Sequence, residues 1–239
     1  MLRCTRKYDQ IYMPTKSLTI SKLSERKARA SRIVAYLKRA YPKPKSELIY
    51  RTQFQFVVAV ILSAQCTDKV VNRVTEKLFK KYTTPADFAK ATPAVFQKEI
   101  SSITFYRNKT KSIISAANDV VKNFNGKVPQ NAEDLQTLHG VGYKTAHVIL
   151  GELFSIWEGI PTDTHVRRFA IRFDLTNNTE LGKISKDLET LVPKRDWKYV
   201  NNGLVLYGRY VCSAHKHDCR AHPLTKLYPQ AATRWPKAR

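Results

Sequence analysis

The chain is poor in acidic residues. Its 239 residues include 19 Asp and Glu against 42 Lys and Arg, which gives a formal net charge of +23 at pH 7. This imbalance favours a polyanionic partner, because each phosphate that a basic side chain neutralises releases counterions. A basic surface that only keeps the protein in solution is the simpler alternative. A membrane surface is a weaker one, since no long basic amphipathic helix stands apart from the core pattern.

Several further absences narrow the class of protein. No run of about 18 apolar residues occurs, so we expect no segment that spans a bilayer. The N-terminus has no apolar signal-peptide core, and the four cysteines do not form a secreted disulfide framework. We therefore expect reduced thiols and an intracellular location; the compartment, whether bacterial cytoplasm and nucleoid or a nucleus or mitochondrion, is left open by these absences.

The sequence pattern predicts an all-α protein. Helix-start signals such as Thr84-Pro85 and Thr92-Pro93 recur along the chain, and Asn125-Gly126 marks a helix end. No alternating strand pattern with hairpin turns competes with them. Apart from short helices at the two prolines, we expect helices over residues 24–41, 53–65, 67–82, 107–124, 131–138, 143–157, 163–173, 180–191 and 197–212.

The most informative stretch is LHGVGYKT, residues 138–145, in which a short loop opens an apolar helix. Gly140 and Gly142 allow a tight turn and a close approach of the backbone to a phosphate. The helix N-terminus behind them offers further N–H groups, and Val141 is expected to anchor the loop. An ordinary helix–helix connection is the simpler reading, because a bare G-x-G is weak evidence.

An amine and a carboxylate accompany this loop. Lys144 falls in the first turn of the expected helix, and Asp163 follows nineteen positions later. A neutral lysine can form a Schiff base with a sugar carbon, and a carboxylate can stabilise an oxocarbenium-like centre. The simpler readings are a surface lysine, an Asp163 that caps the next helix, and a His165 on that helix's surface. Together these residues predict chemistry on a nucleic-acid backbone or sugar.

The residues LHGVGYKTAHVIL followed by TDTHVRRFAIRF resemble the helix-hairpin-helix DNA glycosylases, specifically the endonuclease III family. The resemblance also includes LSAQCTD, ITFY with Lys109, and LYGRYVC, and it covers roughly residues 27 to 228. It implies a two-lobed fold: a six-helix lobe over 46–157 with the hairpin, and a second helical lobe over 27–45 and 158–239. Residues 1–26 would be a basic N-terminal arm.

The resemblance also implies an activity and a partner. The family flips a damaged nucleotide of double-stranded DNA into the cleft between the lobes, because the glycosidic carbon is out of reach inside the stack. We therefore expect a monomeric, bifunctional DNA glycosylase and AP lyase that removes oxidised or ring-saturated pyrimidines. A glycosylase for mismatched or other altered bases is one alternative. A catalytically silent DNA-binding protein is another, although the joint presence of Lys144 and Asp163 argues against it.

The same resemblance assigns roles to individual residues. Lys144 would attack the sugar carbon, and Asp163 would assist departure of the base. Gln65 would fill the gap left by the flipped nucleotide, and Phe105 would act as an apolar wedge, unless it is an ordinary core aromatic. The remaining expected DNA contacts are His139, Gly140, Val141, Gly142, Thr145, His165 and Lys216.

Two departures from the family pattern lie near the hairpin. His139 replaces the usual proline of the turn, which makes the loop less rigid and offers an imidazole to a phosphate. The path from Lys144 to Asp163 is one residue longer than the family pattern, and Thr162 replaces an apolar residue. An extra residue in the loop over 157–160 would absorb this difference without moving the catalytic pair.

The third departure lies near the C-terminus. The family usually ends in C-x6-C-x2-C-x5-C, which holds a [4Fe–4S] cluster. The matching positions are Cys212, Cys219, His222 and Tyr228. With two thiolates missing, we expect no iron–sulfur cluster and no other cofactor or metal. A zinc site of Cys212, His215, Cys219 and His222 is the alternative, although the three-residue gap between the two pairs is very short for one tetrahedral site.

Overall fold

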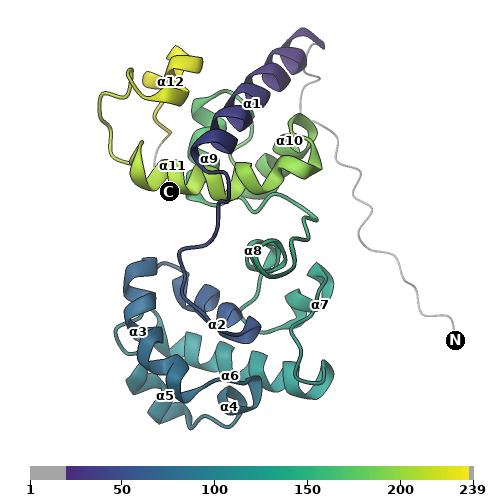
Figure 1. The fold of residues 1–239 in the computed structure, drawn as a ribbon, viewed down its shortest axis with the longest axis vertical. Coiled ribbons are helices and arrows are strands. Elements are labelled where there is room, and N and C mark those ends of the chain that lie inside the picture. Colours follow the sequence, from purple (N-terminus) through teal and green to yellow (C-terminus); the bar gives the residue numbers. More distant parts are fainter. Residues whose placement is uncertain (1–19, 237–239) are drawn as a thin grey trace, which may run out of the picture.

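The computed structural model describes residues 20–236, which form two groups of helices, one above the other in Figure 1. The described residues contain no strand, and the all-α, two-lobed prediction is confirmed. No helix in this part of the chain is long and apolar enough to cross a membrane. The α-helices are α1 (Ile20–Ala40), α2 (Gln53–Ser63), α3 (Asp68–Lys81), α4 (Pro85–Ala89), α5 (Pro93–Glu99), α6 (Tyr106–Asn123), α7 (Ala132–Thr137), α8 (Tyr143–Phe154), α9 (Thr164–Arg172), α10 (Leu181–Leu191), α11 (Leu204–Tyr210) and α12 (Pro223–Leu227).

The first lobe is built around α2, which contacts α3, α6 and α8. Nearly every residue of α2 is buried, as its continuous apolar sequence predicts. The helix begins with a capping box in which Thr52 accepts from the backbone of Gln55 and the Gln55 side chain accepts from the backbone of Thr52. One apolar cluster, drawn from residues between 48 and 150, forms the core of this lobe.

The second lobe brings the first helix together with the last ones. α1 contacts α10, α12 and the segment that leads into α11, while α9 contacts α10 and α11. A second apolar cluster combines residues of α1 with residues between 160 and 231. The linker between α1 and α2 therefore joins the two cores, and α8 lies between them in Figure 1.

Two helices end earlier than the sequence predicts, because other groups bind the carbonyl oxygens near their C-terminal ends. α2 ends at Ser63 because the buried Lys109 ammonium donates to the carbonyl oxygens of Leu62 and Ala64, at 2.8 and 2.6 Å. α8 ends at Phe154, where Ser155 takes a left-handed conformation. The N–H of the following residue then bonds back to Leu150, as in a Schellman motif.

The expected helix over 197–212 is interrupted. A π-helix, Tyr199–Gly203, precedes α11, and its wider turn places both Asn201 and Asn202 at the cleft. Most of the predicted basic arm, residues 1–19, lies outside the described residues, whereas 20–26 form the first turns of α1. The residue boundaries of the two lobes stay a prediction.

Candidate active-site cleft

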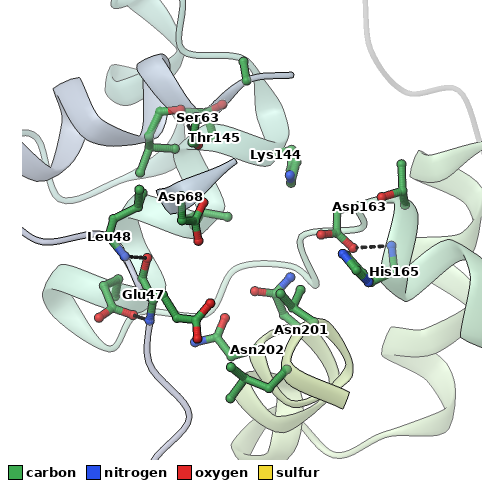
Figure 2. A pocket seen from close by; sticks show the side chains of 18 of the residues that line it. Glu47, Leu48, Ser63, Asp68, Lys144, Thr145, Asp163, His165, Asn201 and Asn202 are labelled. Atoms are coloured by element: carbon green, nitrogen blue, oxygen red, sulfur yellow. Dashed lines mark hydrogen bonds between the residues drawn. The ribbon is translucent and has the colours of Figure 1, made fainter. Parts of the chain in front are cut away.

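Side chains of both lobes line a pocket of about 520 Å³ (Figure 2). This volume is in the range of small-molecule sites, so a flipped nucleoside can fit. Polar and charged groups face it from α3, α8, α9, α11 and the linker before α2. Of the residues predicted from the sequence, the pocket contains Gln65, Lys144, Thr145, Asp163 and His165.

Lys144 lies in the first turn of α8, as the sequence predicts. The N-cap of this helix is Gly142, which provides no side-chain cap, so no N-cap side chain satisfies the N–H groups of the first turn. Within residues 20–236 the Lys144 ammonium makes no hydrogen bond or ion pair. In Figure 2 it faces the same space as Asp163, without a bond between them. Its amine is therefore available to a ligand in the pocket.

Asp163 is the N-cap of α9. Its Oδ1 atom accepts from the backbone N–H groups of His165 and Val166, both at 2.9 Å. Asp163 therefore caps α9, as the simpler interpretation of the sequence expects, but capping uses only one of its two carboxylate oxygens. The Oδ2 atom has no hydrogen-bond partner among the described residues, so the same carboxylate can cap the helix and face a sugar.

His165 packs beneath the cleft against α11. Burial lowers the pKa of its imidazole, with Arg168, Arg209 and Lys144 acting in the same direction and Asp163 opposing them. The ring is therefore neutral at pH 7. Gly208 makes room for it, because a Cβ atom at that glycine would lie 2.3 Å from the Nδ1 atom of His165.

The hairpin between α7 and α8 depends on one glycine more than on the other. Gly140 has φ +87°, and a Cβ atom there would lie 2.7 Å from the Cβ of Ser112. Gly142 has an ordinary negative φ and open space around it. Val141 is buried, as expected of an anchor, and His139 bonds through Nδ1 to the Ser112 hydroxyl at 2.9 Å. The turn that lacks the usual proline is thus tied to α6 by a histidine.

Gln65 and Phe105 share an unusual backbone conformation. Both have positive φ, 53° and 57°, although neither is glycine. Gln65 is exposed in the pocket, and the Phe105 side chain is 58% exposed at the start of α6. Exposure excludes the core-aromatic reading of Phe105. Strained residues cluster at functional sites, which supports a binding role for this pair.

Sequence reasoning missed a network of charges at the mouth of the pocket. Arg209 of α11 forms an ion pair with Asp68 of α3 at 2.7 Å and another with Glu47 of the linker. Tyr210 also donates to Glu47. This network joins the two lobes. The LYGRYVC and LSAQCTD motifs contain three of its four members, and Glu47 lies outside both motifs. The missed asparagines Asn201 and Asn202 donate to the carbonyls of Pro161 and Pro44.

The expectation of a protein without metal or cofactor is wrong. Cys212, His217 and His222 place one possible ligand atom each within 4.8 Å of one another, and this group could hold a metal ion. The predicted zinc ligands His215 and Cys219 are not in this group, and the His215 side chain is exposed.

The same region does not offer four thiolates to a cluster. The matching positions present two thiols, an imidazole and the Tyr228 phenol, whose ring packs against the guanidinium of Arg29 at 4.0 Å. The buried Arg172 bonds to both thiols. These side chains do not form a cage of four thiolates, so no step of the chemistry is derived through a cluster.

Comparison with known proteins agrees with this geometry. Residues 58–194 match the HhH-GPD superfamily base excision DNA repair proteins. Endonuclease III of Synechocystis sp. is 41% identical over 215 residues, 90% of this chain and 98% of the relative. Endonuclease III of Bacillus subtilis is 39% identical over 188 residues, 78% of this chain and 85% of the relative.

Solved structures extend the comparison to the fold. A trapped endonuclease III–DNA covalent intermediate superimposes with a TM-score of 0.81 at 33% identity, covering 87% of this chain and 97% of the other. Endonuclease III proteins typically carry a [4Fe–4S] cluster, which also contradicts the expectation of no cofactor. The chain belongs to the HhH-GPD superfamily and, within it, to the endonuclease III family of DNA N-glycosylases and AP lyases, which act on damaged bases in base excision repair.

Proposed function

We propose that this chain removes oxidised or ring-saturated pyrimidines from double-stranded DNA and then cuts the strand at the resulting site. The observation that supports this most is the placement of Lys144 and Asp163 in one pocket, with the lysine amine unpartnered among the described residues. The pocket is lined by side chains of both lobes, and its volume fits a nucleoside.

In the proposed reaction the neutral Lys144 amine displaces the base at C1′ of the flipped nucleotide. The glycosidic bond breaks as the new C–N bond forms, its electron pair leaves with the base, and the base takes up the proton that the lysine nitrogen loses. The Asp163 carboxylate, oriented by its two backbone hydrogen bonds, stabilises the positive charge on the sugar. The sugar ring opens to an imine with Lys144, loss of a C2′ proton expels the 3′ phosphate, and water releases the lysine.

The DNA contacts that we propose surround this pocket. The backbone of Gly140 and Gly142 and the N-terminus of α8 would hold a phosphate, with His139 and Thr145 beside them. Gln65 and Phe105 would occupy the space that the flipped nucleotide vacates. Neutral His165 would contact the lesion strand, and the exposed Lys216 would lie along the backbone. Since the substrate is cellular DNA, we place the protein inside the cell with its genome.

Borohydride trapping tests this proposal. The protein is incubated with duplexes that carry thymine glycol, dihydrouracil, 8-oxoguanine, a mismatched uracil or an abasic site. We expect a covalent adduct and a strand cut with the ring-saturated pyrimidines and the abasic site, because only an imine is reduced to a stable link. Lys144→Ala should abolish both. Asp163→Asn should slow base release more than it slows cutting at a preformed abasic site.

Lys122→Ala is the matched control, because it removes one exposed positive charge from the end of α6, away from the pocket. It should leave adduct formation unchanged. Preference for the mismatched uracil would replace the proposed substrate class by the alternative one. Tight binding to every duplex without adduct or cutting would contradict the enzymatic proposal.

A further inference from the structure

The segment after α11 gathers three metal-binding side chains that the proposed chemistry does not use. Cys212 is buried at the end of α11, His217 is half-buried in the following loop, and His222 caps α12. One ligand atom of each lies within 4.8 Å of the other two. The Sγ atom of Cys212 is 3.8 Å from the Nε2 atom of His217. Two such ligands of one tetrahedral zinc ion lie about 3.5 Å apart, so the Cys212–His217 pair requires only a small contraction. The pairs with His222, which lie within 4.8 Å, must close by up to about 1.3 Å.

The hydrogen bonds of His217 prepare it as a ligand. Its Nδ1 lies 2.6 Å from the carbonyl oxygen of His215 and therefore donates an N–H to it. This bond leaves the lone pair of Nε2 directed toward the Sγ atom of Cys212. Histidines that bind metals usually donate their second ring nitrogen in this way, which fixes the tautomer and the orientation of the ring.

His222 contributes an independent observation. Its Nδ1 atom is buried and has no hydrogen-bond partner among the described residues. A buried polar atom without a partner costs free energy, and such atoms are rare in folded proteins. The ring lies 5.1 Å from the ring of His217, centroid to centroid, so both imidazoles face the same small volume.

Arg172 supports the sulfur ligand from behind. Its fully buried guanidinium donates to the Sγ atom of Cys212 at 3.0 Å and so fixes the position of the sulfur. The second nitrogen of the same guanidinium donates to Cys219 at 2.9 Å. Cys219 is thereby held beside the three-residue group without being part of it.

We propose that Cys212, His217 and His222 bind one zinc ion, with water as the fourth ligand. One thiolate and two imidazoles are donors that suit zinc, and the three residues close a loop that contains the exposed Lys216. The ion fixes this loop and does not take part in the reaction at Lys144. The site replaces His215 and Cys219 of the sequence-based zinc hypothesis by His217.

Metal analysis of the purified full chain tests the site. After removal of metals and dialysis against zinc, we expect one zinc per chain. Cobalt in its place should give the absorption of a tetrahedral cobalt–thiolate complex. His217→Ala should weaken zinc binding at least about 10-fold, since even the loss of an outer hydrogen-bond partner commonly has that effect. This variant changes a half-buried loop residue and leaves the core intact.

His215→Ala and Cys219→Ser are the matched controls. The first keeps the carbonyl that orients His217, and the second removes the thiol that lies outside the group. Both should bind zinc as the unchanged chain does. Hydrogen exchange over residues 213–221 should rise when a chelator is added to the unchanged chain and should not respond in His217→Ala.

Three results would overturn the proposal. The first is equal zinc binding by the unchanged chain and by His217→Ala. The second is a loss of zinc binding in Cys219→Ser as large as that in His217→Ala, which would support the four-ligand site predicted from the sequence. The third is iron with acid-labile sulfide in anaerobically purified protein, which would assign the region to a cluster.

Discussion

The two lobes stabilise their interiors by different means. Among its described residues the first lobe buries one Lys or Arg side chain, that of Lys109. Its aromatic rings cluster around Phe88, which contacts Phe54, Phe79, Tyr82 and Phe96. The second lobe, in contrast, buries four guanidinium groups within its described residues: Arg26, Arg29, Arg168 and Arg172.

The arginines explain how a lobe with little regular structure at its end can still be packed. Arg168 donates to the carbonyls of Cys212 and Ser213, and Arg172 donates to that of Ala231. The segment after α11 makes few helical hydrogen bonds, so its buried carbonyls need other donors. A guanidinium offers five N–H groups and can satisfy several carbonyls at once. The second lobe therefore differs from the first in that buried guanidinium groups donate the hydrogen bonds that its irregular segment requires.

The largest loss in the free energy of unfolding is expected from the replacement of one buried arginine in the second lobe. Arg172→Met leaves the Ala231 carbonyl and two thiols without their donor, and we expect a loss of about 3–5 kcal/mol in the free energy of unfolding. Urea denaturation measures it. Phe88→Ala, a cavity in the first lobe, should cost a similar amount, about 3–5 kcal/mol.

Hydrogen exchange distinguishes the two mechanisms. In Arg172→Met the increase should be confined to the segment over 211–236, whereas Phe88→Ala should affect α3 to α6. An Arg172→Met variant within about 1 kcal/mol of the unchanged chain would show that packing, not hydrogen bonding, holds the second lobe together.

The hairpin of the first lobe permits a test of backbone constraint. Gly140→Ala meets both a positive φ and the Ser112 side chain, so we expect a loss of about 1–3 kcal/mol and weaker binding to duplex DNA. Gly126→Ala has a positive φ of +75° with open space around it and should cost less. Gly142→Ala has neither constraint. Thermal denaturation should therefore rank the three variants in that order, and equal losses would remove the steric argument.

Sequence reasoning succeeded where a local rule decides the outcome. Thr67, Thr84 and Asn131 cap helices at the predicted starts, because an N-cap needs only a short polar side chain and the next three residues. The placement of Lys144 in the first turn of its helix followed from the same kind of rule. The family resemblance supplied the rest of the pocket, and the roles of its residues stay a prediction.

Sequence reasoning failed where contacts between residues far apart in the sequence determine the structure. The end of α2 depends on Lys109, about forty-five positions later in the chain, and the burial of Arg172 depends on carbonyls and thiols after α11. The choice between His215 and His217 as a metal ligand depends on one loop conformation. Composition and spacing hold no information about such contacts.

A partly buried histidine should also make the stability of the second lobe depend on pH. The pKa of His165 is lowered in the folded state, so the unfolded chain binds the additional proton first as the pH falls below 6.5. Stability should therefore decrease with falling pH, by at most about 1.4 kcal/mol per pH unit, until the lowered pKa is reached. His165→Asn removes this titration, and its unfolding free energy should vary less between pH 7 and pH 5. Equal slopes would contradict the assignment of a neutral buried ring.

The smallest effect is expected at the surface of the first lobe. Asp87 accepts from the backbone N–H groups of Thr83 and Thr84, and these bonds lower the pKa of its carboxyl from 3.8 to about 2. Its contribution is present above pH 3.8 and is lost as the pH falls through about 2. Asp87→Asn should cost about 0.5–1 kcal/mol near pH 7, because the pair is exposed, and the difference from the unchanged chain should vanish at the acidic end of this range. Asp119→Asn on α6 is the control and should change neither value. If Asp87→Asn reduced the free energy of unfolding more than Arg172→Met does, the comparison between the lobes would be reversed. The first lobe would then depend on a surface cap more than the second lobe depends on a buried guanidinium.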